Sequence, residues 1–492
     1  MLRLFNTMTR RKEVFVPLSP PNVGLYTCGP TVYSYIHIGN LRTFMFEDLL
    51  RRYLKYKGYK VTQVMNITDI DDKTIKGANE AGVPLSEFTA RFTRAFFDDI
   101  ASLGIEPAEH YPRATEHIDE MVRLIKRLVE RGYAYESEGS IYFDVGKFEP
   151  YGALAGVKPT PGTRCLRQGR SRIDHDEYDK QDIRDFALWK ASKEGEPSWD
   201  TEIGPGRPGW HIECSAMSMK YLGETFDIHT GGVDNMFPHH ENEIAQSTAA
   251  TGKQLARYWL HSEHLLLDQS KMAKSTGNIY TLREIVELGY EPRQLRYLLL
   301  SAHYRKQLSF SLAALEQAAF ALARIDDFVR NLRSASCSQE VLKDRVDTEA
   351  IETGLDVGLA AECRRKLEVG FEAAMDDDLN ISKALGAFFT FIRSANEQIN
   401  EGQMSEAAKD AIVSLLERLN AVIGVIELQA LDVGVDDALD VGLPADLWEL
   451  IEKRRQAREN QDWELADKVR NELKAKGVII EDTKDGIRIK RA

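Results

Sequence analysis

Hydrophobic and polar positions near the N-terminus follow the periods of a strand, a helix and a second strand. Residues 23–30 form a short apolar run that ends in a Gly-Pro turn. Apolar residues then recur at helical spacing between Leu41 and Leu54, and residues 61–67 predict a second strand. Two strands joined by a helix in this way predict a βαβ unit and a parallel sheet.

The second half of the chain has a different pattern. Residues 311–425 are rich in Ala, Leu and Glu with helical periodicity, which predicts a helical bundle. Residues 430–443 are acidic and interrupted by glycines, as in a linker. After them we expect a helix that begins at Pro444, a second helix over 463–476 and short strands at 478–480 and 487–489.

Composition is that of a soluble globular protein. The 492 residues predict about three domains, with 43% apolar and 29% charged residues. We find no apolar run near the ~18 residues of a membrane-spanning helix. The N-terminus lacks the apolar stretch and cleavage site of a signal peptide, so a cytoplasmic protein is expected.

The charge balance disfavours a general affinity for polyanions. There are 64 basic and 77 acidic residues, so the net charge is −13, and any contact with nucleic acid must use local basic patches. The tail from Pro444 is nearly balanced, with 12 basic and 11 acidic residues. Residues 158–173 are basic and contain no acid, which fits either a solvated loop or a patch that contacts phosphate.

The cysteines do not form a disulfide framework. There are five of them, an odd number at wide spacing, which fits a reducing cytosol. Three have no other candidate ligands nearby in sequence and are interpreted as structural: Cys165, Cys337 and Cys363.

Two local motifs could bind phosphate. His37-Ile38-Gly39-Asn40 leads directly into the first predicted helix, with Asn40 as the expected N-cap, and free N–H groups at a helix N-terminus attract phosphate. Lys271 and Lys274 stand beside Ser275, Thr276 and Gly277, as in a loop that neutralises a departing polyphosphate. Ordinary helix capping and a surface lysine pair are the alternatives for these two motifs.

A third set of residues offers metal ligands. Cys28 ends a predicted strand, Cys214 follows Trp210 and His211, and the segment 237–243 contains two histidines and Glu243. His239 and Glu243 are four residues apart and would share a helix face. Two thiolates, an imidazole and a carboxylate suit tetrahedral Zn²⁺. The spacing does not choose His239 over His240, and a buried inert cysteine beside an acidic surface helix is the alternative.

Taken together, these stretches resemble the cysteinyl-tRNA synthetase family of class I aminoacyl-tRNA synthetases, over nearly the whole chain. Besides residues 26–33 and the HIGH-type and KMSKS-type motifs, the resemblance includes residues 66–73, 206–217, 231–246 and 301–305. It implies an α/β fold with these parts: a Rossmann-type catalytic domain over 1–120 and 206–260, a connective insertion over 121–205, a stem-contact region with the KMSKS-type loop over 261–310, a helical bundle over 311–429 and a small anticodon-reading domain over 444–492.

The resemblance also implies the reaction and its residues. L-Cysteine would react with ATP and Mg²⁺ to give cysteinyl-adenylate, and the acyl group would pass to tRNA(Cys), catalysed by a monomer. The family's zinc ligands fall on Cys28, Cys214, His239 and Glu243. His37 and Asn40 would bind the ATP phosphates, and Lys271 and Lys274 the leaving pyrophosphate. The remaining substrate or ATP contacts would come from Gly29, Thr68, Trp210 and Asp234.

Two positions depart from the family pattern. Asn40 replaces the second histidine of HIGH and still carries a side-chain N–H donor, and Ala273 replaces the central serine of KMSKS. The basic stretch 158–173 is also longer than usual for the family. The competing interpretations are a cysteine ligase of mycothiol synthesis, which lacks the anticodon-reading tail, and an inactive paralogue that binds RNA or zinc.

Overall fold

The chain forms two compact units, residues 1–426 and 427–492. The structure, a computed structural model, describes residues 1–157, 185–267, 270–271, 279–335, 359–402, 404–428, 445–460, 462–476, 478–483 and 486–491. Several parts of the chain that the sequence singled out lie outside these ranges: Cys165, Lys274, Cys337, the basic stretch 158–173 and the linker 430–443.

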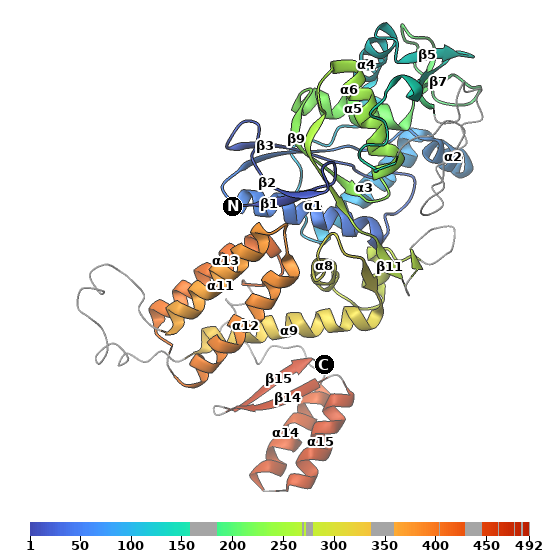
Figure 1. The fold of residues 1–492 in the computed structure, drawn as a ribbon. Coiled ribbons are helices and arrows are strands. Elements are labelled where there is room, and N and C mark those ends of the chain that lie inside the picture. The colour runs from blue at the N-terminus through green and yellow to red at the C-terminus, as the bar shows by residue number, and fades with distance from the viewer. Residues whose placement is uncertain are drawn as a thin grey trace, which may run out of the picture. The chain divides into compact units, whose positions relative to one another are not determined.

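A four-stranded parallel sheet forms the centre of the first unit, in the order β10-β9-β3-β4. Figure 1 labels its two central strands, β3 and β9. The strands are β3 (Asn22–Thr27), β4 (Lys60–Met65), β9 (Phe226–Gly232) and β10 (Ala256–Ser262). Helix α1 (Ile38–Tyr56) connects β3 to β4, and its apolar residues from Leu41 to Leu54 are buried. The predicted βαβ unit, parallel sheet and Rossmann-type fold class are therefore confirmed.

A second, antiparallel sheet is inserted between β4 and β9. Its order is β5-β6-β7-β8, and its last strand ends at Pro208, directly before α5. The elements of this part are α2 (Asp72–Ala81), α3 (Leu85–Ser102), α4 (Ile118–Glu130), β5 (Ala134–Ser137), β6 (Ser140–Phe143), β7 (Phe186–Ala191), β8 (Gly206–Pro208) and α5 (Trp210–Leu222), with 3₁₀ turns at Ala114–Glu116 and Val145–Lys147. Helix α6 (Glu241–Thr251) then joins β9 to β10, after a short π-helical turn at Met236–His240.

Helices dominate the rest of the first unit, as the sequence predicted. Helix α1 packs against α8 and α13. A hairpin of β1 (Arg3–Asn6) and β2 (Arg11–Val14) opens the chain. The later elements are β11 (Leu265–Leu267), β12 (Ser270–Lys271), α7 (Leu282–Glu287), α8 (Pro292–Leu300), β13 (Leu308–Phe310), α9 (Leu312–Ser334), α11 (Leu359–Asp376), α12 (Ile381–Asn400) and α13 (Glu406–Ile423).

The second unit has two helices and a hairpin. These are α14 (Ala445–Glu459), α15 (Trp463–Ala475), β14 (Val478–Thr483) and β15 (Gly486–Arg491), in the order that the sequence predicted. Leu447, Ile451, Val469 and Leu473 form the small core between the two helices. Among all described residues, no helix combines the length and the apolar character needed to cross a membrane.

Candidate active site

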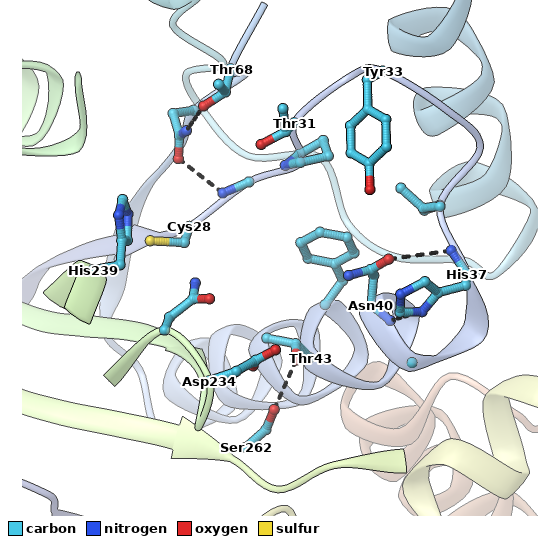
Figure 2. Close-up of a pocket in the computed structure, with 18 of the residues that line it drawn as sticks. Cys28, Thr31, Tyr33, His37, Asn40, Thr43, Thr68, Asp234, His239 and Ser262 are labelled. Carbon is cyan, nitrogen blue, oxygen red and sulfur yellow. Dashed lines mark hydrogen bonds between the residues drawn. The ribbon is translucent and has the colours of Figure 1, made fainter. Parts of the chain in front are cut away.

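A pocket of about 340 Å³ opens at the carboxyl ends of the parallel strands. Cys28 follows β3, Thr68 follows β4, Gly232 ends β9 and Ser262 ends β10, and all four residues line the pocket. Ligands of open parallel sheets bind at this edge, because the strand-to-helix loops there expose backbone and polar groups. Figure 2 shows Cys28 and His239 on one side of this space and His37 and Asn40 on the other.

The motif at residues 37–40 forms the N-terminus of α1. The helix begins at Ile38, so its N-cap is His37, and the expectation that Asn40 caps it is wrong. Asn40 instead occupies the third helical position and completes a reciprocal capping box. Its backbone N–H donates to His37 Nδ1 at 3.2 Å, and its Oδ1 accepts from the His37 N–H at 3.3 Å (Figure 2). An imidazole nitrogen supplies the acceptor that Ser, Thr, Asp or Asn usually gives at an N-cap.

A short chain of hydrogen bonds fixes the opposite wall of the pocket. The Gly29 N–H donates to Asn66 Oδ1 at 2.9 Å, and Asn66 Nδ2 donates to Thr68 Oγ1 at 3.1 Å. Thr68 in turn donates to the buried Glu213 Oε2 at 2.8 Å. A glycine is required at position 29, because an added Cβ would lie 1.8 Å from the backbone oxygen of Asn66.

Four buried metal-ligand side chains converge beside this wall. One donor atom from each of Cys28, Cys214, His239 and Glu243 lies within 4.8 Å of the other three. His239 Nε2 is 3.1 Å from Glu243 Oε1, one helical turn along the chain. Ligands on a tetrahedral zinc ion lie ~3.5 Å apart. The donor types and their separations therefore fit a zinc ion.

Two of these ligands, His239 and Glu243, are also held from behind by residues that we call outer partners. The contacts use the second ring nitrogen of His239 and the second carboxylate oxygen of Glu243. His229 Nε2 lies 2.8 Å from Glu243 Oε2, and His211 Nδ1 lies 2.8 Å from His239 Nδ1. Trp210 stacks on the His239 ring with centroids 4.2 Å apart. Such partners orient metal ligands, and the atoms that would hold an ion here are Nε2 of His239 and Oε1 of Glu243.

A second ligand set overlaps the first. Cys28, His229, His240 and Glu243 also place donor atoms within 4.8 Å of one another. His240 Nε2 is 3.3 Å from Cys28 Sγ, while its Nδ1 lies 2.8 Å from His261 Nε2. The spacing in the sequence did not choose between His239 and His240, and the structure places both in the same cluster.

Burial controls protonation in this cluster. It lowers the pKa of His239 to about 3, so this imidazole is neutral and free to bind a cation. It also raises the pKa of the Cys28 thiol well above its usual value, with Cys214 adding to the shift. A bound cation would lower the thiol pKa again, because a metal ion stabilises thiolate.

Comparison with known proteins identifies the family. The family described as "tRNA synthetases class I (C) catalytic domain" matches residues 14–320. The DALR domain matches residues 370–427, and the cysteinyl-tRNA ligase anticodon binding domain matches 440–489. Proteins named cysteine–tRNA ligase are similar over the full length: one from Protochlamydia amoebophila is 42% identical over 100% of this chain and 98% of its own, and one from Brachyspira hyodysenteriae is 44% identical over 99% and 98%.

The chain belongs to the cysteine–tRNA ligase family of class I aminoacyl-tRNA synthetases. Solved structures support the class I fold alone. Methionyl-tRNA synthetase of Mycobacterium tuberculosis with methionyl-adenylate aligns with a TM-score of 0.59 at 14% identity, over 82% of this chain and 92% of that one. A putative arginyl-tRNA synthetase of Campylobacter jejuni has a TM-score of 0.52 at 13% identity, over 84% and 93%.

The predicted site residues of this cysteine–tRNA ligase family member fall into three groups. Most line the pocket: Cys28, Gly29, His37, Asn40, Thr68, Trp210, Cys214, Asp234 and His239. Glu243 lies behind them, fully buried, and reaches the cluster through its carboxylate. Lys271 is described only through its backbone, in β12, where it pairs with Leu266, and Lys274 lies outside the described residues.

Sequence reasoning missed the outer partners. His229 stands in β9, whose residues are all buried, and no motif in the sequence set it apart. Its position three residues before the carboxyl end of a parallel strand was the available signal, since ligands gather at that edge. Glu213, which accepts a hydrogen bond from Thr68, was missed as well, because only its neighbour Cys214 was considered as a site residue.

Proposed function

We propose that this protein activates L-cysteine with ATP and transfers it to tRNA(Cys), and that a zinc ion at Cys28, Cys214, His239 and Glu243 selects the substrate thiol. The observation that carries the proposal is the meeting, in one pocket, of a buried sulfur-rich donor set with the His37–Asn40 helix N-terminus. The anticodon-domain match at residues 440–489 favours tRNA over an amino sugar as the acceptor.

The helix N-terminus suits the phosphates of ATP. The positive end of the α1 dipole lies at the pocket, beside His37 and Asn40, which are held by their reciprocal bonds. The substrate carboxylate is already a nucleophile at neutral pH, so catalysis consists of positioning it against the α-phosphate and stabilising charge. Lys271 and Lys274, with Mg²⁺, would neutralise the departing pyrophosphate.

The donor set suits discrimination between cysteine and serine. A shape-based pocket separates such similar substrates by only a few kcal/mol. A zinc ion supplies a different criterion, because it accepts a thiolate at about 2.3 Å and lowers the thiol pKa, whereas a neutral hydroxyl gains much less. Thr68 and Trp210 would then shape the space around the amino acid, and Asp234 would hold a polar group of the substrate or ATP.

Two assays test the activity in order. Pyrophosphate exchange with cysteine should proceed without tRNA and should be far slower with serine. Addition of tRNA(Cys) should then yield cysteinyl-tRNA. Absence of exchange with cysteine would reject the activation step, and exchange without transfer to tRNA would reject the acceptor.

The ligand assignment has its own test with a matched control. Cys214→Ser removes a thiolate of the proposed set, and we expect zinc content and cysteine activation to fall together. His240→Gln alters the overlapping set only and should keep one zinc ion per chain. Retention of zinc by the Cys214 variant, or its loss only from the His240 variant, would reject the assignment.

A further inference from the structure

A second cleft, of about 380 Å³, lies beside the active-site pocket. It is formed by α3 and by Arg283 of α7, and Tyr35 lines both hollows. Tyr35 precedes His37 by two residues, so the cleft borders the loop that leads into α1. Backbone bonds join this loop to the start of α7, since the Ile38 N–H donates to the Tyr280 carbonyl at 2.8 Å.

One face of α3 supplies most of the charge in this cleft. Glu87, Arg91, Arg94 and Asp98 follow one another at helical spacing and all line it. Such spacing allows acid–base pairs along a helix. Among the described residues, however, neither Arg91 nor Arg94 lies within 4.0 Å of a carboxylate oxygen, and both are exposed. The Arg94 side chain also forms no hydrogen bond with any residue that the structure describes.

The other two basic groups of the cleft are held in place by Tyr35. The Arg283 guanidinium lies 5.0 Å from the centre of the Tyr35 ring, and it pairs with Asp99 at 3.3 Å. Arg91 Nη2 donates to the Tyr35 hydroxyl at 3.5 Å, with its guanidinium 6.0 Å from the same ring. Guanidinium groups fixed in this way lose little side-chain freedom when they bind a ligand.

We propose that this cleft binds the phosphate backbone of the tRNA acceptor arm where its 3′ end enters the active site, with Arg94 as the principal phosphate contact. The proposal rests on the proposed function. A chain with a net charge of −13 must bind RNA through local basic groups. Three arginines and two carboxylates line this cleft, and Arg283 is the one arginine of the three that pairs with a carboxylate among the described residues. The 3′ end must also reach the adjoining pocket, and arginine forks match phosphate geometry.

The test uses Arg94→Gln, with Arg94→Lys as the charge-preserving variant. The control is Arg123→Gln on α4, an exposed arginine paired with Glu120. Two ligands are compared: full-length tRNA(Cys), and a minihelix that contains only the acceptor stem and the 3′ end. Binding is measured over a range of salt concentrations, and pyrophosphate exchange with cysteine is measured without RNA.

We expect Arg94→Gln to weaken the binding of both RNAs on the order of fivefold. The slope of log K against log[salt] should become shallower by about 0.7–0.9, which corresponds to the loss of one phosphate contact. Arg94→Lys should restore the slope, and Arg123→Gln should change neither quantity. Wild-type affinity and slope in Arg94→Gln, or weaker tRNA binding without an effect on the minihelix, would overturn the proposal. Pyrophosphate exchange should be unchanged in Arg94→Gln; a wild-type protein without exchange would refute the proposed function instead.

Discussion

His239 Nε2, in the turn before α6, lies 3.1 Å from Glu243 Oε1, in the first turn of α6. Both atoms are buried, and each side chain is held from behind, Glu243 by His229 and His239 by His211. An imidazole and a carboxylate fixed in this way present converging donor atoms to the thiols of Cys28 and Cys214.

The first prediction concerns the outer partner of Glu243. His229→Phe removes the nitrogen that holds Glu243 Oε2, so zinc affinity should fall about 10–100-fold. His229→Gln keeps a side-chain donor and should recover part of the loss. Chelator competition measures the affinity, and His117→Gln, a buried histidine paired with Tyr221, is the control. Unchanged affinity in His229→Phe would show that this contact does not support the ligand.

The second prediction separates helix capping from ATP binding at Asn40. Asn40→Asp keeps the oxygen that accepts from the His37 N–H, so stability should change by less than about 0.5 kcal/mol. The added negative charge would face the ATP phosphates, so KM for ATP should rise on the order of tenfold. Asn40→Ala should instead cost about 1 kcal/mol of stability. An unaltered KM in the Asp variant would place the phosphates elsewhere.

The third prediction uses the close approach at Gly29. An added Cβ would meet the Asn66 carbonyl at 1.8 Å, so Gly29→Ala should destabilise the protein by roughly 1–3 kcal/mol and impair cysteine activation. Gly386→Ala in α12 is the control, since its added Cβ meets no atom within 4 Å. Denaturant midpoints and pyrophosphate exchange check both variants. Equal behaviour of the two would disprove the steric argument.

The fourth prediction concerns Glu47, which is buried in α1 against Thr230 of β9. Burial raises its pKa to about 8, although the Thr230 hydroxyl donates to Oε1 at 2.8 Å. The folded state therefore binds a proton that the unfolded state loses near its usual pKa of 4.5. This contribution to stability is intact below pH 4.5 and is lost as pH rises toward 8.

Glu47→Gln removes this dependence. Relative to the wild type, the variant should gain roughly 3 kcal/mol of stability between pH 5 and pH 8. Denaturant unfolding of both proteins at the two pH values measures the difference, and the effects of all other groups cancel in the comparison. A stability difference that is independent of pH would mean that the buried carboxyl does not change its protonation on unfolding.

The sequence predicted much of the fold because its signals are local. Neighbouring residues carry the helical period between Leu41 and Leu54 and the Gly-Pro turn at residue 29. The structure confirms the strand and the helix that these signals predict. The prediction that Asn40 caps α1 was wrong for a local reason as well. Asparagine is a common N-cap and histidine is a rare one, but only the three-dimensional loop shows which side chain faces the free N–H groups.

The site was harder to predict because its ligands come from distant segments. The spacing of His239 and Glu243 predicted one shared face, which the structure bears out. No spacing rule joins Cys28 to Cys214. Their residue types made them candidate zinc ligands, and the resemblance to a family then implied that pair. His229 was missed because a histidine in a buried strand has no pattern of its own, and its partner Glu243 follows only after the chain turns back.

The central claim is that the substrate sulfur binds a zinc ion held by Cys28, Cys214, His239 and Glu243. X-ray absorption at the zinc edge counts the sulfur neighbours of the ion in the purified protein, first alone and then with saturating cysteine or serine. The account predicts two sulfur neighbours at about 2.3 Å in the free protein, three with cysteine and two with serine. A sulfur count that cysteine leaves unchanged, or a protein without zinc that activates cysteine fully, would contradict it.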